Sequence, residues 1–134
     1  MRVLPDTNVL ASAFGSRGLC ADVLHLVIAD HDLIVADVVL VELRRALREK
    51  FRVPTETVTE IEAFLRQHTV VPRPTKHLKL GLRDADDEWV VASARAGTAD
   101  VIVTGDRDLL DAKVRLPVQA LSPRSFWELV KAPR

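Results

Sequence analysis

The sequence is short of cysteine, aromatic residues, net charge and long apolar runs. Its single cysteine, Cys20, excludes a disulfide within the chain and fits a reducing cytosol. With no tyrosine and 4% aromatic residues, the core has to be aliphatic. No apolar run approaches the ~20 residues of a membrane span, and the start lacks a signal-peptide pattern. Nineteen basic and nineteen acidic residues cancel, so any surface for nucleic acid must be local.

What is present is an ordinary globular composition. The chain has 134 residues, of which 48% are hydrophobic and 28% are charged. That length is enough to bury a sizeable core. We therefore expect one domain over residues 1–134, located in the cytoplasm and not attached to a membrane.

Short apolar runs alternate with amphipathic segments along the chain. Strands are expected at residues 2–4, 33–35, 69–71, 101–103 and 118–121. Helices are expected at 8–14, 19–29, from an Asp37 N-cap to about 50, from 54–56 onward, from Asp84 or Asp86 to 96, around 108–111 and near 124–131. This alternation predicts an α/β sandwich with a mostly parallel sheet. Ligands of such sheets bind outside the carboxyl ends of the strands.

Acidic residues occupy comparable places in this pattern. Asp6 directly follows the first strand, Asp106 follows the strand at 101–103, and Asp87 lies in the first turn of a helix. Glu42 lies in mid-helix beside an apolar stripe, where an unpaired carboxylate is costly to bury. If the strands are parallel, these acids converge at one edge of the sheet.

Each acid also has an ordinary structural interpretation. Asp6 and Asp106 suit helix caps, Asp87 suits a helix N-terminus, and Glu42 can pair with Arg45. As a group they are harder to explain in this way, because carboxylates ~4 Å apart repel by up to ~4 kcal/mol at an effective dielectric near 20. Such a cluster needs protons or a cation, and oxygen ligands alone suit Mg²⁺ or Mn²⁺ rather than zinc.

Four ordered motifs resemble those of the PIN-domain family. They are D-T-N-V-L-A-S-A at the start, V-E-L in the helix after Asp37, D-D-E-W-V-V-A-S-A at 86–94, and V-T-G-D-R-D-L-L at 103–110. The sequence looks most like the VapC-type toxins of toxin–antitoxin pairs. The resemblance implies a three-layer sandwich with about five mostly parallel strands flanked by helices. It also implies an endoribonuclease that uses Mg²⁺ or Mn²⁺ to hydrolyse RNA phosphodiester bonds.

The same resemblance implies roles for individual residues. The acidic quartet, catalytic and metal-binding, falls on Asp6, Glu42, Asp87 and Asp106. Asp108 is similar to an auxiliary acid of the metal site, and Thr104 to the hydroxyl residue that precedes the last acid. Asp87 is preferred to Asp86 as the third acid for its distance to the following helix. VapC-like proteins commonly form homodimers and are inhibited by a protein antitoxin, so both partners are expected here.

Two features qualify this interpretation. Pro5 stands where the family usually has an aliphatic residue, and because proline has no N–H, we expect the first strand to lose pairing there. Contacts to RNA have to come from local positive charge, for which the candidates are Arg44, Arg45 and Arg107, together with Thr104.

Two other functions fit parts of the pattern. One is a catalytically silent PIN-like binding module that retains the acids for folding or for contact with an antitoxin. The other is a phosphoacceptor domain of the response-regulator type, which also has acids at strand ends. That second alternative calls for paired acids after the first strand and a lysine near the last one, and the sequence has neither.

Overall fold

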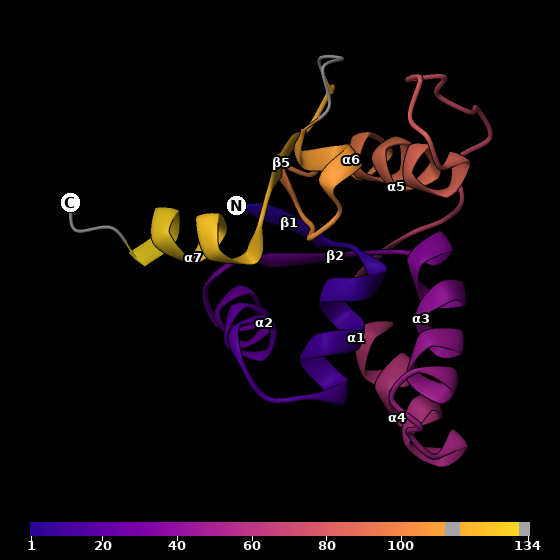
Figure 1. The fold of residues 1–134 in the computed structure, drawn as a ribbon, viewed down its shortest axis with the longest axis vertical. Coiled ribbons are helices and arrows are strands. Elements are labelled where there is room, and N and C mark those ends of the chain that lie inside the picture. The colour runs from indigo at the N-terminus through magenta and orange to yellow at the C-terminus, as the bar shows by residue number, and fades with distance from the viewer. Residues whose placement is uncertain (112–115, 132–134) are drawn as a thin grey trace.

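A computed structural model describes residues 1–111 and 116–131. Within these residues, five strands form a parallel sheet in the order β3-β2-β1-β4-β5 (Figure 1). The strands are β1 (Arg2–Pro5), β2 (Asp32–Ala36), β3 (Thr69–Val71), β4 (Val101–Val103) and β5 (Gln119–Leu121). The helices are α1 (Thr7–Gly15), α2 (Leu19–Asp30), α3 (Asp37–Glu49), α4 (Thr55–Leu65), α5 (Ala85–Ala96), α6 (Arg107–Leu110) and α7 (Pro123–Lys131).

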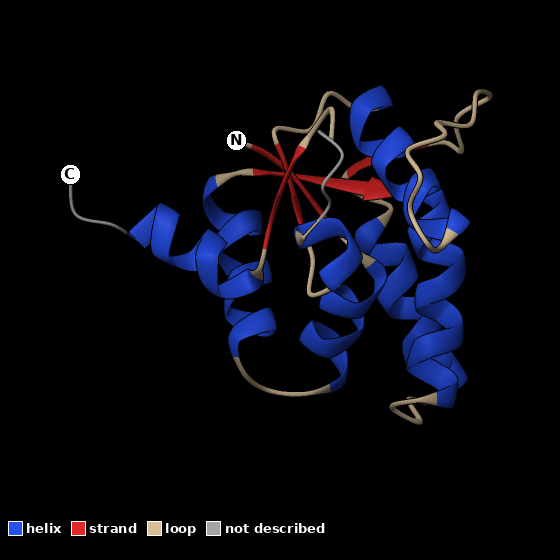
Figure 2. Ribbon diagram, turned by 45° about the horizontal axis from the view of Figure 1, so that its top comes forward, coloured by secondary structure: helices blue, strands red, loops and turns tan. Residues whose placement is uncertain are grey.

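Helices cover both faces of the sheet. Figure 1 shows α5 and α6 above the strands and α1 to α4 below them, and Figure 2 shows the strand ribbons edge on, crossing one another among the helices. Helix α7 packs against α2 and β5. The predicted three-layer α/β sandwich with a parallel sheet is therefore confirmed. None of the helices in the described part of the chain has the length and apolarity required to cross a bilayer.

The core is aliphatic, as the shortage of aromatic residues predicts. Leu4, Ile34 and Ile102 come from the three central strands and are completely buried. Phe126 from α7 is the one aromatic side chain among the buried core residues that the structure describes. Each such side chain contributes about 1.5–3 kcal/mol through removal from water. The strands are thus fixed by burial on both faces, as parallel strands require.

The strand order creates a switch point between β1 and β4. From β1 the chain steps outward through β2 to β3, then returns to the other side of β1 to form β4 and β5. Ligand sites of open α/β sheets lie outside the carboxyl ends of strands at such a point. The order also differs from the 2-1-3-4-5 order of response-regulator domains, so the phosphoacceptor alternative is wrong at the level of the fold.

Two local predictions need correction. Asp37 is not an N-cap: Ala36 occupies that position, and Asp37 is the first residue of α3, with its carboxylate 3.1 Å from Arg66. Pro5 does not end all pairing of β1. Pairing with β2 stops at Val3, but on the other side Pro5 stays in register with Val103, whose carbonyl accepts the Asp6 N–H at 3.0 Å. Pro5 is tolerated because the next residue supplies the hydrogen-bond donor.

Gly97 provides a test of the packing between α5 and the sheet. A Cβ added at Gly97 would lie 2.5 Å from Cγ2 of Val71 and 3.2 Å from Cγ2 of Ile34. We expect Gly97→Ala to lower the free energy of unfolding by about 1–3 kcal/mol, because core overpacking costs that much. Thermal melting checks this, with Gly105→Ala as the control, since a Cβ at Gly105 meets no atom within 4 Å. Equal midpoints for the two variants would contradict the close packing.

Candidate metal centre

An acidic cleft of about 330 Å³ opens at the carboxyl edge of the sheet. Asp6 enters it from the end of β1, Glu42 from α3, Asp87 from the first turn of α5, and Asp106 from the residue that caps α6. These four acids are far apart in the sequence, and they come from both helical layers. The structure brings all four to the wall of one cleft, at the switch point between β1 and β4.

Asp6 is fixed by hydrogen bonds on both of its carboxylate oxygens. Oδ1 accepts the Val9 N–H at 3.0 Å and so caps α1, and Oδ2 accepts the Thr104 hydroxyl. The Thr104 oxygen in turn accepts the Asp106 N–H at 2.9 Å. Burial raises the pKa of the Asp6 carboxyl, although the hydrogen bonds from Thr104 and Val9 oppose the rise. Cap and candidate ligand are therefore compatible roles for one side chain.

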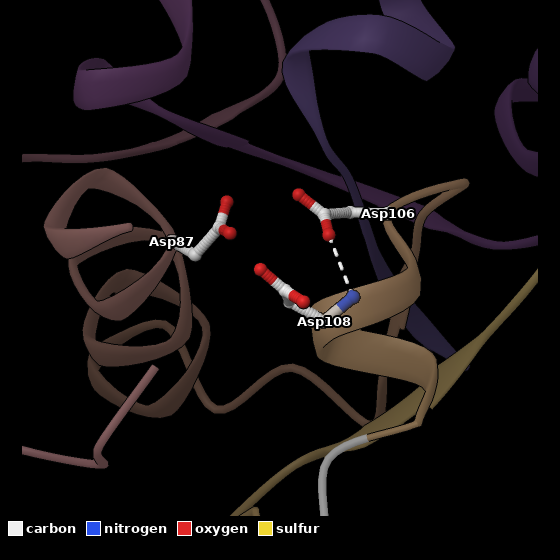
Figure 3. Close-up of side chains that lie close together, drawn as sticks. All are labelled: Asp87, Asp106 and Asp108. Atoms are coloured by element: carbon white, nitrogen blue, oxygen red, sulfur yellow. Dashed lines mark hydrogen bonds between the residues drawn. The ribbon is translucent and has the colours of Figure 1, made fainter. Parts of the chain in front are cut away.

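Three carboxylates gather beside Asp6. Asp87, Asp106 and Asp108 each offer one oxygen, and these oxygens lie within 4.8 Å of one another. Figure 3 shows the three side chains converging, with Asp87 reaching from α5 toward Asp106 and Asp108 at the start of α6. Asp106 Oδ1 accepts the Asp108 N–H at 2.8 Å, which caps α6 and sets the angle between these two acids. Asp108 was predicted as an auxiliary acid of this site, and it lies in the cluster.

Asp87 is the least satisfied member of the cluster. Its Oδ2 is buried and has no hydrogen-bond partner among the described residues. Burial, followed by the negative charge of Asp106, raises the pKa of the Asp87 carboxyl to about 7. An oxygen that is buried without a donor has a free lone pair to offer to a cation or a proton.

The neighbouring acids of α5 have other surroundings. Asp84 is the N-cap of the helix and accepts the Asp86 N–H at 2.9 Å, and both Asp84 and Asp86 are exposed at the rim of the cleft. Asp87 alone of the three belongs to the cluster with Asp106 and Asp108. This geometry supports Asp87 over Asp86 as the third acid.

Glu42 lines the cleft from the layer opposite Asp87. It is half-buried, and its carboxylate does not belong to the group of three within 4.8 Å. The described residues therefore hold a tight trio of aspartates, with Asp6 hydrogen-bonded behind it and Glu42 facing the same space. Glu42 is placed to reach a molecule in the cleft from a second direction.

The donor set fits a hard divalent cation. The ligand atoms are all carboxylate oxygens, one of them has no partner, and the cluster concentrates negative charge. Zinc prefers nitrogen or sulfur ligands in most sites, whereas Mg²⁺ and Mn²⁺ prefer oxygen. The residues present thus match the expected metal chemistry.

The residues predicted to contact RNA lie outside this cleft. Arg44 pairs with Glu62 at 3.3 Å, Arg45 lies 3.6 Å from Glu49, and Arg107 lies 3.8 Å from Asp111. Arg44 and Arg45 line a separate surface hollow, which adjoins the acidic cleft only at Val41. Their contact with RNA stays a prediction.

Thr104 requires a correction to its predicted contact with RNA. The residue is completely buried, and its hydroxyl is hydrogen-bonded to Asp6 and to the Asp106 amide. A side chain in that position cannot reach RNA. Thr104 instead supports two acids from behind.

Asp37, Arg73 and Trp89 also line the cleft, and the sequence did not mark them as site residues. Asp37 follows β2 directly and Arg73 lies two residues after β3, so the strand-end rule that selected Asp6 and Asp106 applies to both. Arg73 lies over Trp89, with its guanidinium carbon 4.1 Å from the ring centre. Trp89 lines the cleft from α5.

Comparison with known proteins gives a family model and several similar folds. The model described as PIN domain matches residues 2–108. VapBC2 from Rickettsia felis, solved bound to a DNA fragment from its promoter, has a TM-score of 0.64 and 17% identity over 91% of this chain and 98% of that chain. FitAcB from Neisseria gonorrhoeae has a TM-score of 0.66 and 18% identity over the same shares. FitAB bound to an IR36 DNA fragment has a TM-score of 0.64 and 18% identity, covering 90% of this chain and 94% of that one. No curated protein matches the chain.

The raised pKa of Asp87 predicts how stability depends on pH in the metal-free protein. Because the folded pKa is about 7 and the ordinary value is 3.8, the folded state holds a proton that the unfolded chain has released. The free energy of unfolding should therefore fall as the pH rises through about 7. Melting midpoints in EDTA, from about pH 5 to about pH 8, should show this decline for the wild type and a flatter profile for Asp87→Asn. Asp30 is exposed, so Asp30→Asn serves as the control and should keep the wild-type slope of melting midpoint against pH. If Asp87→Asn also kept that slope, the raised pKa of Asp87 would be contradicted.

Metal binding should reverse this loss of stability. We expect Mn²⁺ or Mg²⁺ to raise the melting midpoint of the wild type, since a ligand at a hundred times its dissociation constant adds about 2.7 kcal/mol to the free energy of unfolding. Asp87→Asn and Asp106→Asn should lose most of the rise, whereas Asp30→Asn should keep it. A rise of the same size in all four proteins would mean that the metal binds elsewhere.

Proposed function

This chain belongs to the PIN-domain family, and we propose that it is a metal-dependent endoribonuclease that acts as the toxin of a toxin–antitoxin pair. The observation that carries the proposal is the acidic cleft, where Asp87, Asp106 and Asp108 converge and one buried oxygen has no partner. Helix capping accounts for Asp6 and Asp106, but it does not account for Asp87 in the same cleft. Residues 1–134 would act as one nuclease domain in the cytoplasm.

Asp87, Asp106 and Asp108 would hold the metal ion, with Asp6 contributing from the end of β1. When bound, Mg²⁺ or Mn²⁺ activates a water molecule and stabilises the negative charge that develops on the phosphate. Thr104 keeps the Asp6 carboxylate turned toward the cleft and tethers the Asp106 backbone to it. The fixed position of these carboxylates means that little reorganisation is needed at the moment of reaction.

Glu42 is proposed either as a further ligand or as the group that orients the attacking water. Its position on α3, across the cleft from Asp87, supports the second role. A carboxylate that is not consumed by the metal can accept a hydrogen bond from a water molecule and hold it in line with a phosphate. Hydrolysis then breaks one phosphate–oxygen bond of the RNA backbone.

The toxin role and its partners are supported by similarity. The VapBC2 structure matches the resemblance of the motifs to VapC-type toxins, and it was solved with DNA from its promoter. We therefore propose a protein antitoxin and a homodimer for this chain as well. A basic segment of an antitoxin would compete for the carboxylates of the cleft, which would place inhibition and catalysis at the same site.

The proposal is tested by cleavage of mixed RNA with purified protein and Mn²⁺ or Mg²⁺. Wild type should cleave and should stop in EDTA. Asp87→Asn and Asp106→Asn should lose roughly a hundredfold or more in rate, about 3 kcal/mol of transition-state stabilisation, because each removes a charge from the metal site. Asp30→Asn, purified in the same way, should match wild type.

Two outcomes would contradict the proposed activity. If all variants cleave equally, a contaminant is the nuclease. If wild type cleaves no RNA although Mn²⁺ raises its melting midpoint, the chain is the catalytically silent binding module that the sequence also allows.

A further inference from the structure

The loop between β3 and α5, residues 72–84, carries an unusual charge pattern beside the acidic cleft. Residues 72–83 contain Arg73, Lys76, Lys79 and Arg83 and no acid, although the whole chain is neutral. All four side chains are exposed, and none forms an ion pair with the described residues. In Figures 1 and 2 the loop stands out from the body of the molecule next to α5.

The loop is fastened to the first turn of α5. The carboxylate of Glu88, which is only 7% exposed, accepts the Leu80 N–H, and His77 Nε2 lies 3.4 Å from the same carboxylate. Leu80 and Leu82 pack against the core on either side of Gly81, whose φ of +73° lets the chain turn there. The segment that carries the basic side chains is therefore held in place against α5 and the core.

Arg73 connects this loop to the acidic cleft. It is the one basic residue among the residues that line the cleft, where it faces seven carboxylates. Its guanidinium carbon lies over the Trp89 ring, 4.1 Å from the ring centre, and this cation–π contact restrains the side chain. Stacking occupies the face of the guanidinium and leaves its N–H groups free at the edge, where they can donate two parallel hydrogen bonds to a phosphate.

The positive charge of the loop favours the approach of an anionic strand beside the cleft. Four cations attract a polyphosphate backbone and offset the repulsion between that backbone and the acids. The exposed basic side chains recur every three or four residues along the loop, so several of them can contact the phosphates of one strand.

We propose that Arg73, stacked on Trp89, binds a backbone phosphate of single-stranded RNA at the mouth of the cleft, and that the loop at 72–84 guides the strand away from it. This inference rests on the proposed function, because it takes RNA as the strand that enters the acidic cleft. It makes Arg73 a substrate-binding residue, and it gives the cations at 76, 79 and 83 the role of sequence-independent phosphate contacts.

The test is a binding titration with fluorescein-labelled single-stranded RNA. The parent protein carries Asp87→Asn, so that the RNA stays intact, and the buffer contains Mg²⁺. Adding Arg73→Gln should weaken binding roughly tenfold and should lower the slope of log affinity against log salt by about 0.7. Adding Lys76→Gln and Lys79→Gln together should lower that slope by about 1.4. Arg73→Lys should restore only part of the affinity, because lysine keeps the charge but loses the planar stack.

Arg95→Gln is the matched control, since Arg95 is an exposed arginine at the other end of α5 and outside the cleft. It should leave affinity and salt slope unchanged, and all variants should melt at the midpoint of the parent. The inference is overturned if Arg73→Gln and Arg95→Gln bind RNA equally, or if the parent binds no RNA. If wild type cleaves no RNA but binding still depends on Arg73, the nuclease proposal fails and this inference stands. If wild type cleaves RNA but Arg73→Gln and Arg95→Gln bind RNA equally, this inference fails and the nuclease proposal stands.

Discussion

Repulsion between carboxylates at one edge of a parallel sheet is the constraint to which the surrounding structure responds. The strand order brings Asp6 and Asp106 to the same switch point, and α5 adds Asp87 from above. Cap hydrogen bonds hold Asp6 and Asp106 in position, and Asp87 Oδ2 has no partner among the described residues. The fold thus fixes the positions of these carboxylates and leaves an oxygen of Asp87 for a proton or a cation.

Much of this arrangement was predictable because it depends on short-range rules. Apolar runs of three to five residues mark the strands, and residues in the first few positions after a parallel strand lie at its carboxyl edge. Asp6 and Asp106 follow from that reasoning alone. The choice of Asp87 over Asp86 also depended on the motif resemblance, because one step along a helix changes the direction of the side chain by about 100°.

The missed residues show where such rules end. Asp37 was assigned a capping role that its position in α3 does not allow. The strand-end rule places Arg73 near the cleft, but its position over the Trp89 ring depends on the path of the loop after β3, which is set by tertiary contacts such as those of Glu88. Thr104 was predicted to contact RNA because its complete burial just after β4 is not visible in the sequence. Side chains that depend on long-range packing are the ones that pattern analysis loses.

Asp87 and Glu88 are adjacent in the first turn of α5, and their side chains serve different sides of the helix. Asp87 faces the acidic cleft, whereas Glu88 holds the basic loop. The rotational phase of one helix therefore sets both the site and its flank. A single-residue insertion ahead of Asp87 that shifted the helix register would turn both acids by about 100°. Such an insertion would disturb the acidic cleft and the attachment of the loop at once, so this end of α5 tolerates substitutions far better than a change of length.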